Sequence, residues 1–327
     1  MTTPVTTTRA PQPRTTRSGG LTIRGLNKSY GDHHHVLKDM SLSVTPGEIY
    51  GFVGSNGAGK STTMRIALGV LSADSGEVFL GDSPIDDNLR RRIGYMPEER
   101  GLYNNEKIAD QLTFFGQLHG MRKPIARDAA LDLLESLGLA ERKDSKLEEL
   151  SLGNQQRMQL AASLIHDPDL LILDEPFSGL DPVAVNVMST MLVERANQGV
   201  PVLFSSHQLD LVQRLCHRVG IIAHGQMQAE GSVTELRNRG PITYFVGTSA
   251  RGWEPEFARV VRDEAGGVFV EIDREDRDQE LLNAALEAGP VHEFRREIPD
   301  LTDLFQEVVH SADSDAVSAT TATPKEA

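Results

Sequence analysis

The chain has 327 residues, which is enough for one large domain and a smaller one. Hydrophobic residues make up 39% of it and charged residues 24%, as in an ordinary globular protein. The net charge of −14 argues against a broad DNA- or RNA-binding surface, because such a surface needs clustered Lys and Arg.

The first twenty residues, the apolar stretches and the cysteine content indicate where in the cell the protein is expected. The first twenty residues are rich in Thr, Pro and Arg and have no apolar core, so they do not read as a secretory signal. We predict a disordered tail, with a transit peptide as the alternative. No stretch reaches the roughly 18 to 20 apolar residues of a membrane helix. The single cysteine, Cys216, cannot form an internal disulfide, which fits a reducing cytoplasm.

Four regions follow one another along the chain. Residues 1–20 are the predicted tail, and residues 21–238 alternate apolar strands with amphipathic helices, which predicts a mostly parallel sheet covered by helices. Residues 241–310 are predicted to form a small separate α/β unit. Residues 311–327 are polar and poor in bulky apolar side chains, so we predict disorder there.

The strongest motif follows a predicted buried strand at residues 48–54. Residues 54–61 read GSNGAGKS and match G-x-x-x-x-G-K-[ST]. Glycines in such a loop let backbone amides turn inward around phosphate oxygens. Lys60 would reach the β- and γ-phosphates of a nucleotide, and the Ser61 hydroxyl would ligate Mg²⁺. A helix beginning near Lys60 would direct its positive end at the anion.

A second motif places two acids after a short apolar run. Residues 170–175 read LLILDE, which predicts a central strand whose carboxyl end delivers Asp174 and Glu175 to the edge where open α/β sheets bind ligands. Asp174 would hold Mg²⁺, directly or through water, and Glu175 would polarise an attacking water. The alternative is two solvated acids at a strand end, but Pro176 and the phosphate motif argue against it.

Later segments narrow the class of phosphate-binding protein. Residues 150–156 read LSLGNQQ and lie about twenty residues before the acidic motif, residues 178–181 read SGLD, and His207 follows a strand-like run. In order and spacing these motifs, with Tyr30 upstream, resemble those of the ABC-type ATPases over about two thirds of the chain.

The resemblance implies a fold and a set of roles. The expected fold is α/β: a P-loop NTPase (RecA-like) core with an antiparallel β subdomain and an α-helical subdomain at about residues 103–160, plus a small C-terminal α/β domain at residues 241–310. His207 would contact the γ-phosphate and act in catalysis beside Glu175. Ser151 and Gly153 would open a helix whose N-terminus donates to ATP held by the opposite subunit.

The same resemblance gives the remaining candidates, with Tyr30 stacking on adenine. The candidate ATP-binding residues are Tyr30, Gly54, Ser55, Asn56, Gly57, Ala58, Gly59, Lys60, Ser61, Thr62, Ser151, Gly153 and Asp181, and the candidate Mg²⁺ ligands are Ser61, Glu98 and Asp174.

Two positions depart from the family pattern. Leu152 and Asn154 stand in the signature where Gly and Gln are common, and similar variants occur within the family. Glu98 occupies the usual position of a glutamine beside the metal, where a carboxylate can do the same job. The surrounding run YMPEERGLY and the C-terminal unit resemble the exporter branch that includes sodium-export and antibiotic-efflux subunits.

We therefore predict an ATP-hydrolysing motor that dimerises on ATP and drives a separate transmembrane permease, from the cytoplasmic face of the cell membrane. The second ATPase subunit would be an identical copy or a related chain. The alternative is an ABC-type ATPase acting on the ribosome or on nucleic acid; the acidic balance, the single ATPase half and the lack of a coiled coil argue against it.

Overall fold

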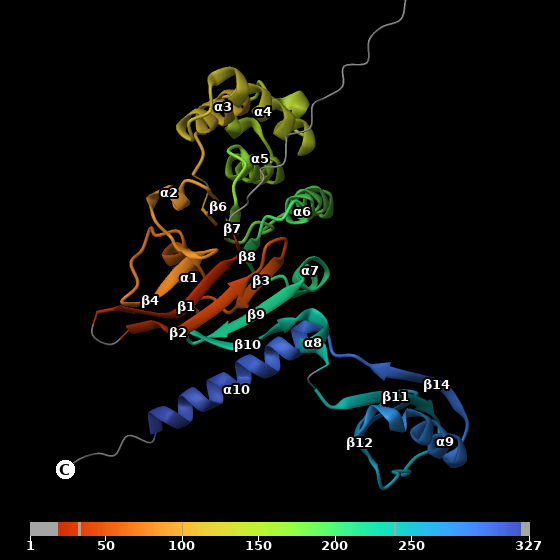
Figure 1. Ribbon diagram of the computed structural model, residues 1–327. Helices are drawn as coiled ribbons and strands as arrows, with labels where there is room; N and C mark the ends of the chain where they lie inside the picture. Colours follow the sequence, from red (N-terminus) through yellow and green to blue (C-terminus); the bar gives the residue numbers. More distant parts are fainter. Residues whose placement is uncertain (1–18, 32–33, 100, 239, 322–327) are drawn as a thin grey trace, which may run out of the picture. The chain divides into compact units, whose positions relative to one another are not determined.

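The computed structural model describes residues 19–31, 34–99, 101–238 and 240–321 (Figure 1). Contacts divide these residues into two compact units. The first holds the described residues up to 49 together with residues 61–205, and the second holds residues 50–60 and those from 206 onward. The predicted tail at residues 1–20 falls almost wholly outside the described residues.

An antiparallel sheet opens the first unit, with strand order β2-β1-β4-β5. Its strands are β1 (Leu21–Tyr30), β2 (His34–Val44), β4 (Ser75–Leu80) and β5 (Ser83–Pro84). β1 and β2 form a hairpin that pairs Leu21 with Val44 and Tyr30 with His34. Buried and more accessible side chains alternate at the start of β1, as in a half-buried strand.

Three neighbouring parallel strands lie in the first unit: β6 (Ile93–Met96), β7 (Leu170–Leu173) and β8 (Val202–Ser206). β7 lies between the other two, and its Leu173 is in register with Met96 on one side and Phe204 on the other. Every residue of β7 and β8 is buried. Continuous apolar runs form such strands because both sheet faces are covered.

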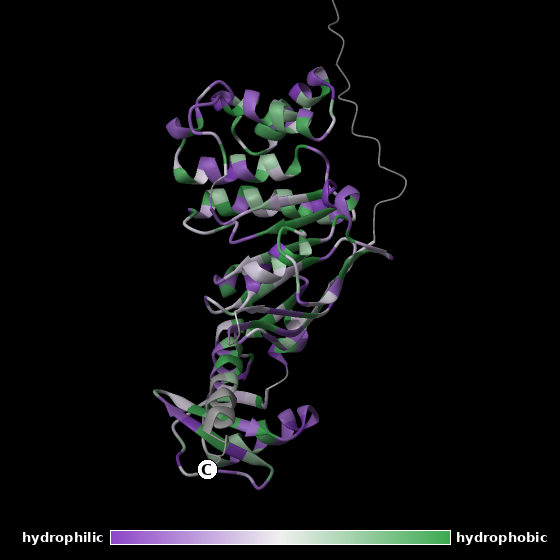
Figure 2. Ribbon diagram, turned by 90° about the vertical axis from the view of Figure 1, so that its left-hand side faces the viewer, coloured by the Kyte–Doolittle hydropathy of each residue, from purple (hydrophilic) through white to green (hydrophobic). Residues whose placement is uncertain are grey.

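Helices make up the rest of the first unit. They are α1 (Lys60–Ala67), α2 (Asp87–Arg90), α3 (Ile108–Leu118), α4 (Lys123–Ser136), η1 (Ala140–Arg142), η2 (Leu147–Glu149), α5 (Leu152–Leu164) and α6 (Pro182–Asn197). α3, α4 and α5 contact one another and form the helical cluster in the upper part of Figure 1. These helices carry both hydrophilic and hydrophobic residues along their length (Figure 2), as expected for helices buried on one side.

In the second unit, β3 (Ile49–Gly54) pairs in parallel with β9 (Arg218–Ala223), which pairs antiparallel with β10 (Gln226–Ser232). Two short helices, α7 (Leu209–Leu215) and α8 (Val233–Arg237), flank these strands in the chain. Within the described residues, no helix combines the length and apolarity needed to cross a membrane.

A four-stranded antiparallel sheet follows, with strand order β12-β13-β11-β14. Its elements are β11 (Ile242–Thr248), β12 (Ala258–Glu264), β13 (Gly267–Ile272), η3 (Glu275–Arg277), α9 (Asp278–Ala288) and β14 (Val291–Glu297). α9 buries Leu281 and Ala285 against Val246, Val268 and Val270 of the sheet. The sequence pattern predicts strands at residues 242–246, 268–272 and 291–294 and a helix at residues 279–286, which correspond to β11, β13, β14 and α9, and β12 is an additional strand.

The last helix, α10 (Leu301–Thr321), corrects the prediction of disorder from residue 311. Its start is anchored, because the Leu301 amide donates to Gln213 Oε1 at 2.9 Å and Arg237 Nε donates to the Pro299 carbonyl at 2.8 Å. Elongating an established helix adds one hydrogen bond per residue, and the following stretch is rich in Ala, a strong helix former. Residues 322–327 lie outside the described residues.

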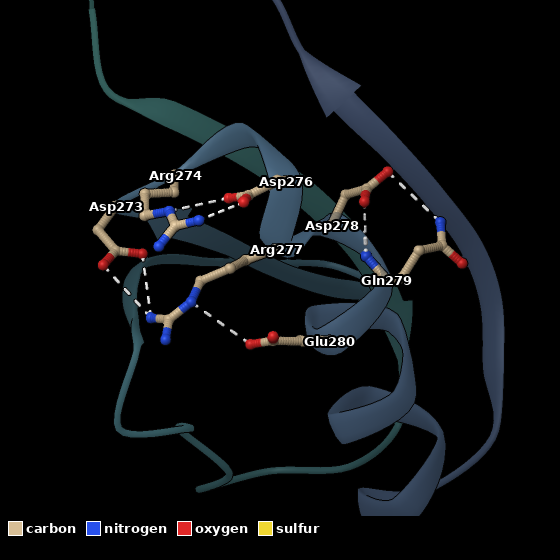
Figure 3. A network of polar contacts seen from close by, with 7 residues as sticks. All are labelled: Asp273, Arg274, Asp276, Arg277, Asp278, Gln279 and Glu280. Atoms are coloured by element: carbon tan, nitrogen blue, oxygen red, sulfur yellow. Dashed lines mark hydrogen bonds and ion pairs between the residues drawn. The ribbon is translucent and has the colours of Figure 1, made fainter.

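Charged residues cluster where α9 begins (Figure 3). Arg277 pairs with Asp273 at 3.3 Å and with Glu280 at 3.4 Å, and Arg274 pairs with Asp276. Acids in the first turn also suit the positive end of the helix dipole. Exposed pairs of this kind contribute at most about 1 kcal/mol each, so the apolar core holds the domain together.

That core gives a prediction for stability. Leu281 is fully buried in it, whereas Leu286 on the same helix is 54% exposed. Leu281→Ala should lower the free energy of unfolding of this domain by about 2–5 kcal/mol through lost burial and a residual cavity. Leu286→Ala should change it by about 0.5 kcal/mol or less.

Trp253, the single tryptophan, packs against this core, so its fluorescence during urea denaturation reports on this domain. Equal shifts of the two variants would contradict the packing described for α9.

Candidate functional site

The loop between β3 and α1 has the shape expected of a phosphate cradle. Gly57 and Gly59 have φ of 81° and 111°, a region that side chains other than glycine rarely adopt. The Lys60 ammonium donates to the carbonyls of Gly54 at 2.6 Å and Ser55 at 3.2 Å. Lys60 is buried, while Ser55, Asn56 and Gly57 are exposed. The lysine charge is therefore held against the loop, whose exposed residues face solvent.

Gly54 is required by close packing at the base of the loop. It is in register with Ile222 of β9. A Cβ at this position would lie 2.5 Å from the Ile222 carbonyl oxygen, 2.6 Å from Ile222 Cγ2 and 3.3 Å from Ala58 Cβ. The strand and the loop can approach this closely only because position 54 carries no side chain.

The two acids follow β7, in the first unit. Asp174 is 2% exposed and Glu175 8%. The Asp174 amide donates to the Met96 carbonyl of β6 at 2.8 Å. Asp174 Oδ1 accepts a hydrogen bond from Ser205 Oγ at 2.6 Å, and Ser205 Oγ in turn accepts one from the Glu175 amide at 2.9 Å. Glu175 has φ of 49°, in the left-handed region.

Glu98 lies in the loop after β6 and is exposed. Burial raises the pKa of the Tyr95 hydroxyl, and the negative charges of Asp174 and Glu98 raise this pKa further. Tyr95 is thus an electrostatic neighbour of two of the three predicted metal ligands, Asp174 and Glu98. No group of three or more metal-binding side chains exists among the described residues. Mg²⁺ binds proteins through one or two carboxylates and takes its other ligands from phosphate and water. Asp174, Glu98 and the Ser61 hydroxyl are oxygen donors of the kind that it uses.

The signature segment begins helix α5. Ser151 caps this helix, and its Oγ accepts a hydrogen bond from the Asn154 amide at 3.4 Å. Ser151 and Leu152 are both exposed, so the first turn is accessible. A Cβ at Gly153 would make ordinary contacts, 3.5 Å from Ala184 Cβ. The exposed N-terminus of α5 offers backbone donors that suit an anion.

Two buried glutamines connect α5 to the other predicted site segments. Gln156 Nε2 donates to the Pro176 carbonyl at 3.1 Å, directly after the acid pair. Gln159 Nε2 donates to the Pro97 carbonyl at 2.7 Å, directly before Glu98. Neither these glutamines nor Ser205 were predicted from the sequence to belong to the site. The sequence feature that could have identified the glutamines is their place on the helix that begins at the signature. They are three residues apart, so they lie on the same face of that helix.

The remaining candidates are placed as follows. Tyr30 ends β1 and is 48% exposed, and the Lys28 ammonium lies 5.6 Å from the centroid of its ring. His207 follows β8 and is exposed. Asp181 caps α6, its Oδ1 accepting from the Ala184 amide at 2.8 Å. Ser61 and Thr62 lie in the first turn of α1 and are partly buried.

Comparison with known proteins identifies this arrangement. Residues 37–178 match the ABC transporter family model, and residues 231–309 match the C-terminal domain of DrrA1-3-like ATP-binding proteins. The chain is 37% identical over 296 residues to the uncharacterized ABC transporter ATP-binding protein YhaQ of Bacillus subtilis, covering 88% of this chain and 98% of that protein. The chain belongs to the ABC transporter ATP-binding proteins. It is an ATPase of the ABC type, whose hydrolysis of ATP serves transport.

Relatives of the ABC ATPase include two with a described role. The linearmycin resistance ATP-binding protein LnrL of Bacillus subtilis is 36% identical, over 67% of this chain and 71% of its own length. The Nod factor export ATP-binding protein I of Paraburkholderia xenovorans is 37% identical, over 64% and 70%. A solved ATP-binding subunit of an ABC transporter superposes with a TM-score of 0.62 at 28% identity, covering 67% of this chain and 92% of that one.

These findings confirm the predicted fold. The ABC ATPase has a P-loop core, an antiparallel sheet subdomain, a helical subdomain and a β-rich C-terminal domain. The assignment to the sodium-export and antibiotic-efflux branch stays a prediction, as do the roles of the individual site residues.

The packing at Gly54 gives a prediction for this loop. Gly54→Ala should displace the loop from β9, because overpacking of this kind costs about 1–3 kcal/mol. The displaced loop should bind phosphate less well, so ATP affinity should fall by about tenfold. Gly240→Ala is the control, since a Cβ there meets nothing within 4 Å. Isothermal titration with ATP measures the effect, and an unchanged affinity in Gly54→Ala would contradict this account.

Proposed function

We propose that this ABC ATPase is the motor of an exporter, and that two ATPase chains close head to tail on Mg²⁺-ATP to drive a separate membrane-spanning permease. The observation that carries the proposal is the exposed N-terminus of α5, capped by Ser151. Amides at a helix N-terminus bind anions. In the proposed dimer, the anion at this end is the γ-phosphate of ATP bound by the other chain.

Each candidate residue has a proposed role around that nucleotide. Lys60 holds the β- and γ-phosphates, with amides of the loop from Gly54 to Thr62, and Tyr30 stacks on adenine. Asp174, Ser61 and Glu98 hold Mg²⁺, which when bound neutralises charge on the phosphates. Three further residues act at the γ-phosphate or at the opposite chain. Glu175 orients the attacking water, His207 contacts the γ-phosphate, and Asp181 lies at the dimer contact.

Export is supported by the names of the relatives, one a Nod factor exporter and one a resistance protein. The motif around Glu98 and the DrrA-like C-terminal domain favour the sodium-export and antibiotic-efflux branch. We place the chain at the cytoplasmic face of the cell membrane through its permease. The alternative, an ABC-type ATPase acting on the ribosome or nucleic acid, is disfavoured by the net charge of −14.

The proposal predicts that Ser151 acts across the dimer. Ser151→Arg should leave ATP binding by the single chain unchanged and should abolish steady-state hydrolysis, because Arg blocks the helix end that meets the other chain's ATP. Ser136→Arg, at an exposed serine on α4, should keep both properties. Equilibrium ATP binding and phosphate release measure them.

Mixing two defective variants tests whether Ser151 acts on the ATP of the opposite chain. A Lys60→Ala chain combined with a Ser151→Arg chain forms heterodimers with one intact composite site and one site broken twice. The mixture should therefore hydrolyse ATP faster than either variant alone. Loss of ATP binding by the isolated Ser151→Arg chain, or no recovery on mixing, would count against a shared site.

A further inference from the structure

Ser205 is a polar residue in the buried part of the central sheet. It lies on β8, is fully buried, and follows three apolar residues of the same strand, Val202, Leu203 and Phe204. A hydroxyl in such surroundings is costly unless its hydrogen bonds are made within the protein. The Ser205 hydroxyl makes two, and both are with the acid pair after β7.

The register of the sheet explains why the two groups meet. β7 and β8 run in parallel, with Leu173 opposite Phe204. One residue further along come Asp174, just past the end of β7, and Ser205 on β8, so the register brings the two residues side by side. Ser205 Oγ donates to Asp174 Oδ1 at 2.6 Å. A hydroxyl–carboxylate hydrogen bond of this length is of the charge-assisted kind, which fixes geometry more strongly than a neutral one.

The same oxygen also holds the backbone of the second acid. The Glu175 amide donates to Ser205 Oγ at 2.9 Å. Glu175 adopts φ of 49°, which is sparsely populated for a residue with a side chain and persists only where the surroundings impose it. Without Ser205 this buried amide would lose the partner that accompanies the left-handed turn.

Asp174 is thus held from both neighbouring strands. Its amide donates to Met96 on β6, and its carboxylate accepts from Ser205 on β8. We infer that Ser205 is a positioning residue for ATP hydrolysis, which orients the Asp174 carboxylate toward the metal and fixes the backbone turn that aims Glu175 at the attacking water. This inference rests on the roles proposed above for Asp174 and Glu175.

Two substitutions at Ser205, to Thr and to Val, are nearly isosteric with each other and separate the effect of the hydroxyl from the effect of side-chain size. Ser205→Thr keeps the oxygen, and Ser205→Val replaces it with a methyl group, while both add the same branch to a strand position that favours β-branched residues. Ser205→Ala removes the oxygen without adding volume, and it serves as the test if the two larger variants do not fold.

The first measurement needs neither nucleotide nor metal. Hydrogen exchange of the Glu175 amide in the nucleotide-free protein should be faster in Ser205→Val and Ser205→Ala than in the wild type, and Ser205→Thr should restore protection. This result tests the hydrogen bond independently of the proposed function. Equal protection in the wild type and both hydroxyl-free variants would overturn the inference, even if the protein hydrolyses ATP as proposed.

The second measurement separates metal from nucleotide. ATP affinity without divalent metal should be unchanged in Ser205→Val, whereas apparent Mg²⁺ affinity and kcat should each fall by about tenfold or more, as for other residues that orient a metal ligand. Ser205→Thr should recover both. Equal impairment of the Thr and Val variants, or lost metal-free ATP affinity in Ser205→Val, would overturn the positioning role. A wild-type chain that neither binds nor hydrolyses ATP would instead refute the proposed function.

Discussion

Two carboxylates lie buried at the end of an apolar strand, and much of the surrounding structure makes that burial possible. An ionised carboxylate taken out of water is strongly destabilising unless hydrogen bonds and opposite charge compensate. The Asp174 carboxylate accepts a hydrogen bond from Ser205 Oγ on β8. The backbone amides of the two acids are also paired, that of Asp174 with the Met96 carbonyl of β6 and that of Glu175 with Ser205 Oγ. The opposite charge is what the proposed function supplies, because Mg²⁺ at this position would balance the acids. In the proposed function, a cation completes this site.

Helix α5 extends this constraint to the molecular surface. Its N-terminus at Ser151 is exposed, while Gln156 and Gln159 on its buried face donate to backbone carbonyls beside the acid pair and beside Glu98. A displacement of the helix end would therefore be felt at both segments, since a buried hydrogen bond is costly to break without replacement. This gives the proposed dimer contact a physical route, within one chain, to the acids proposed to act in hydrolysis.

The sequence was most informative where chemistry demands particular residues at fixed spacing. The phosphate loop, the acid pair and the signature were found that way, and the ABC ATPase fold followed from their order. β12 was missed because a register irregularity between Val260 and Arg262 interrupts its alternation, and most of its side chains are exposed. Ser205 was missed because its partners depend on which strands are neighbours and in what register, which no local pattern reveals.

The central claim is that the buried acid pair performs hydrolysis, and single-turnover kinetics with Glu175→Gln test it most directly. The amide keeps the shape of the side chain and removes the charge that orients water. ATP affinity should match the wild type, while the rate of the chemical step should fall by about a hundredfold or more. A Glu175→Gln chain that cleaves bound ATP at the wild-type single-turnover rate would contradict the account.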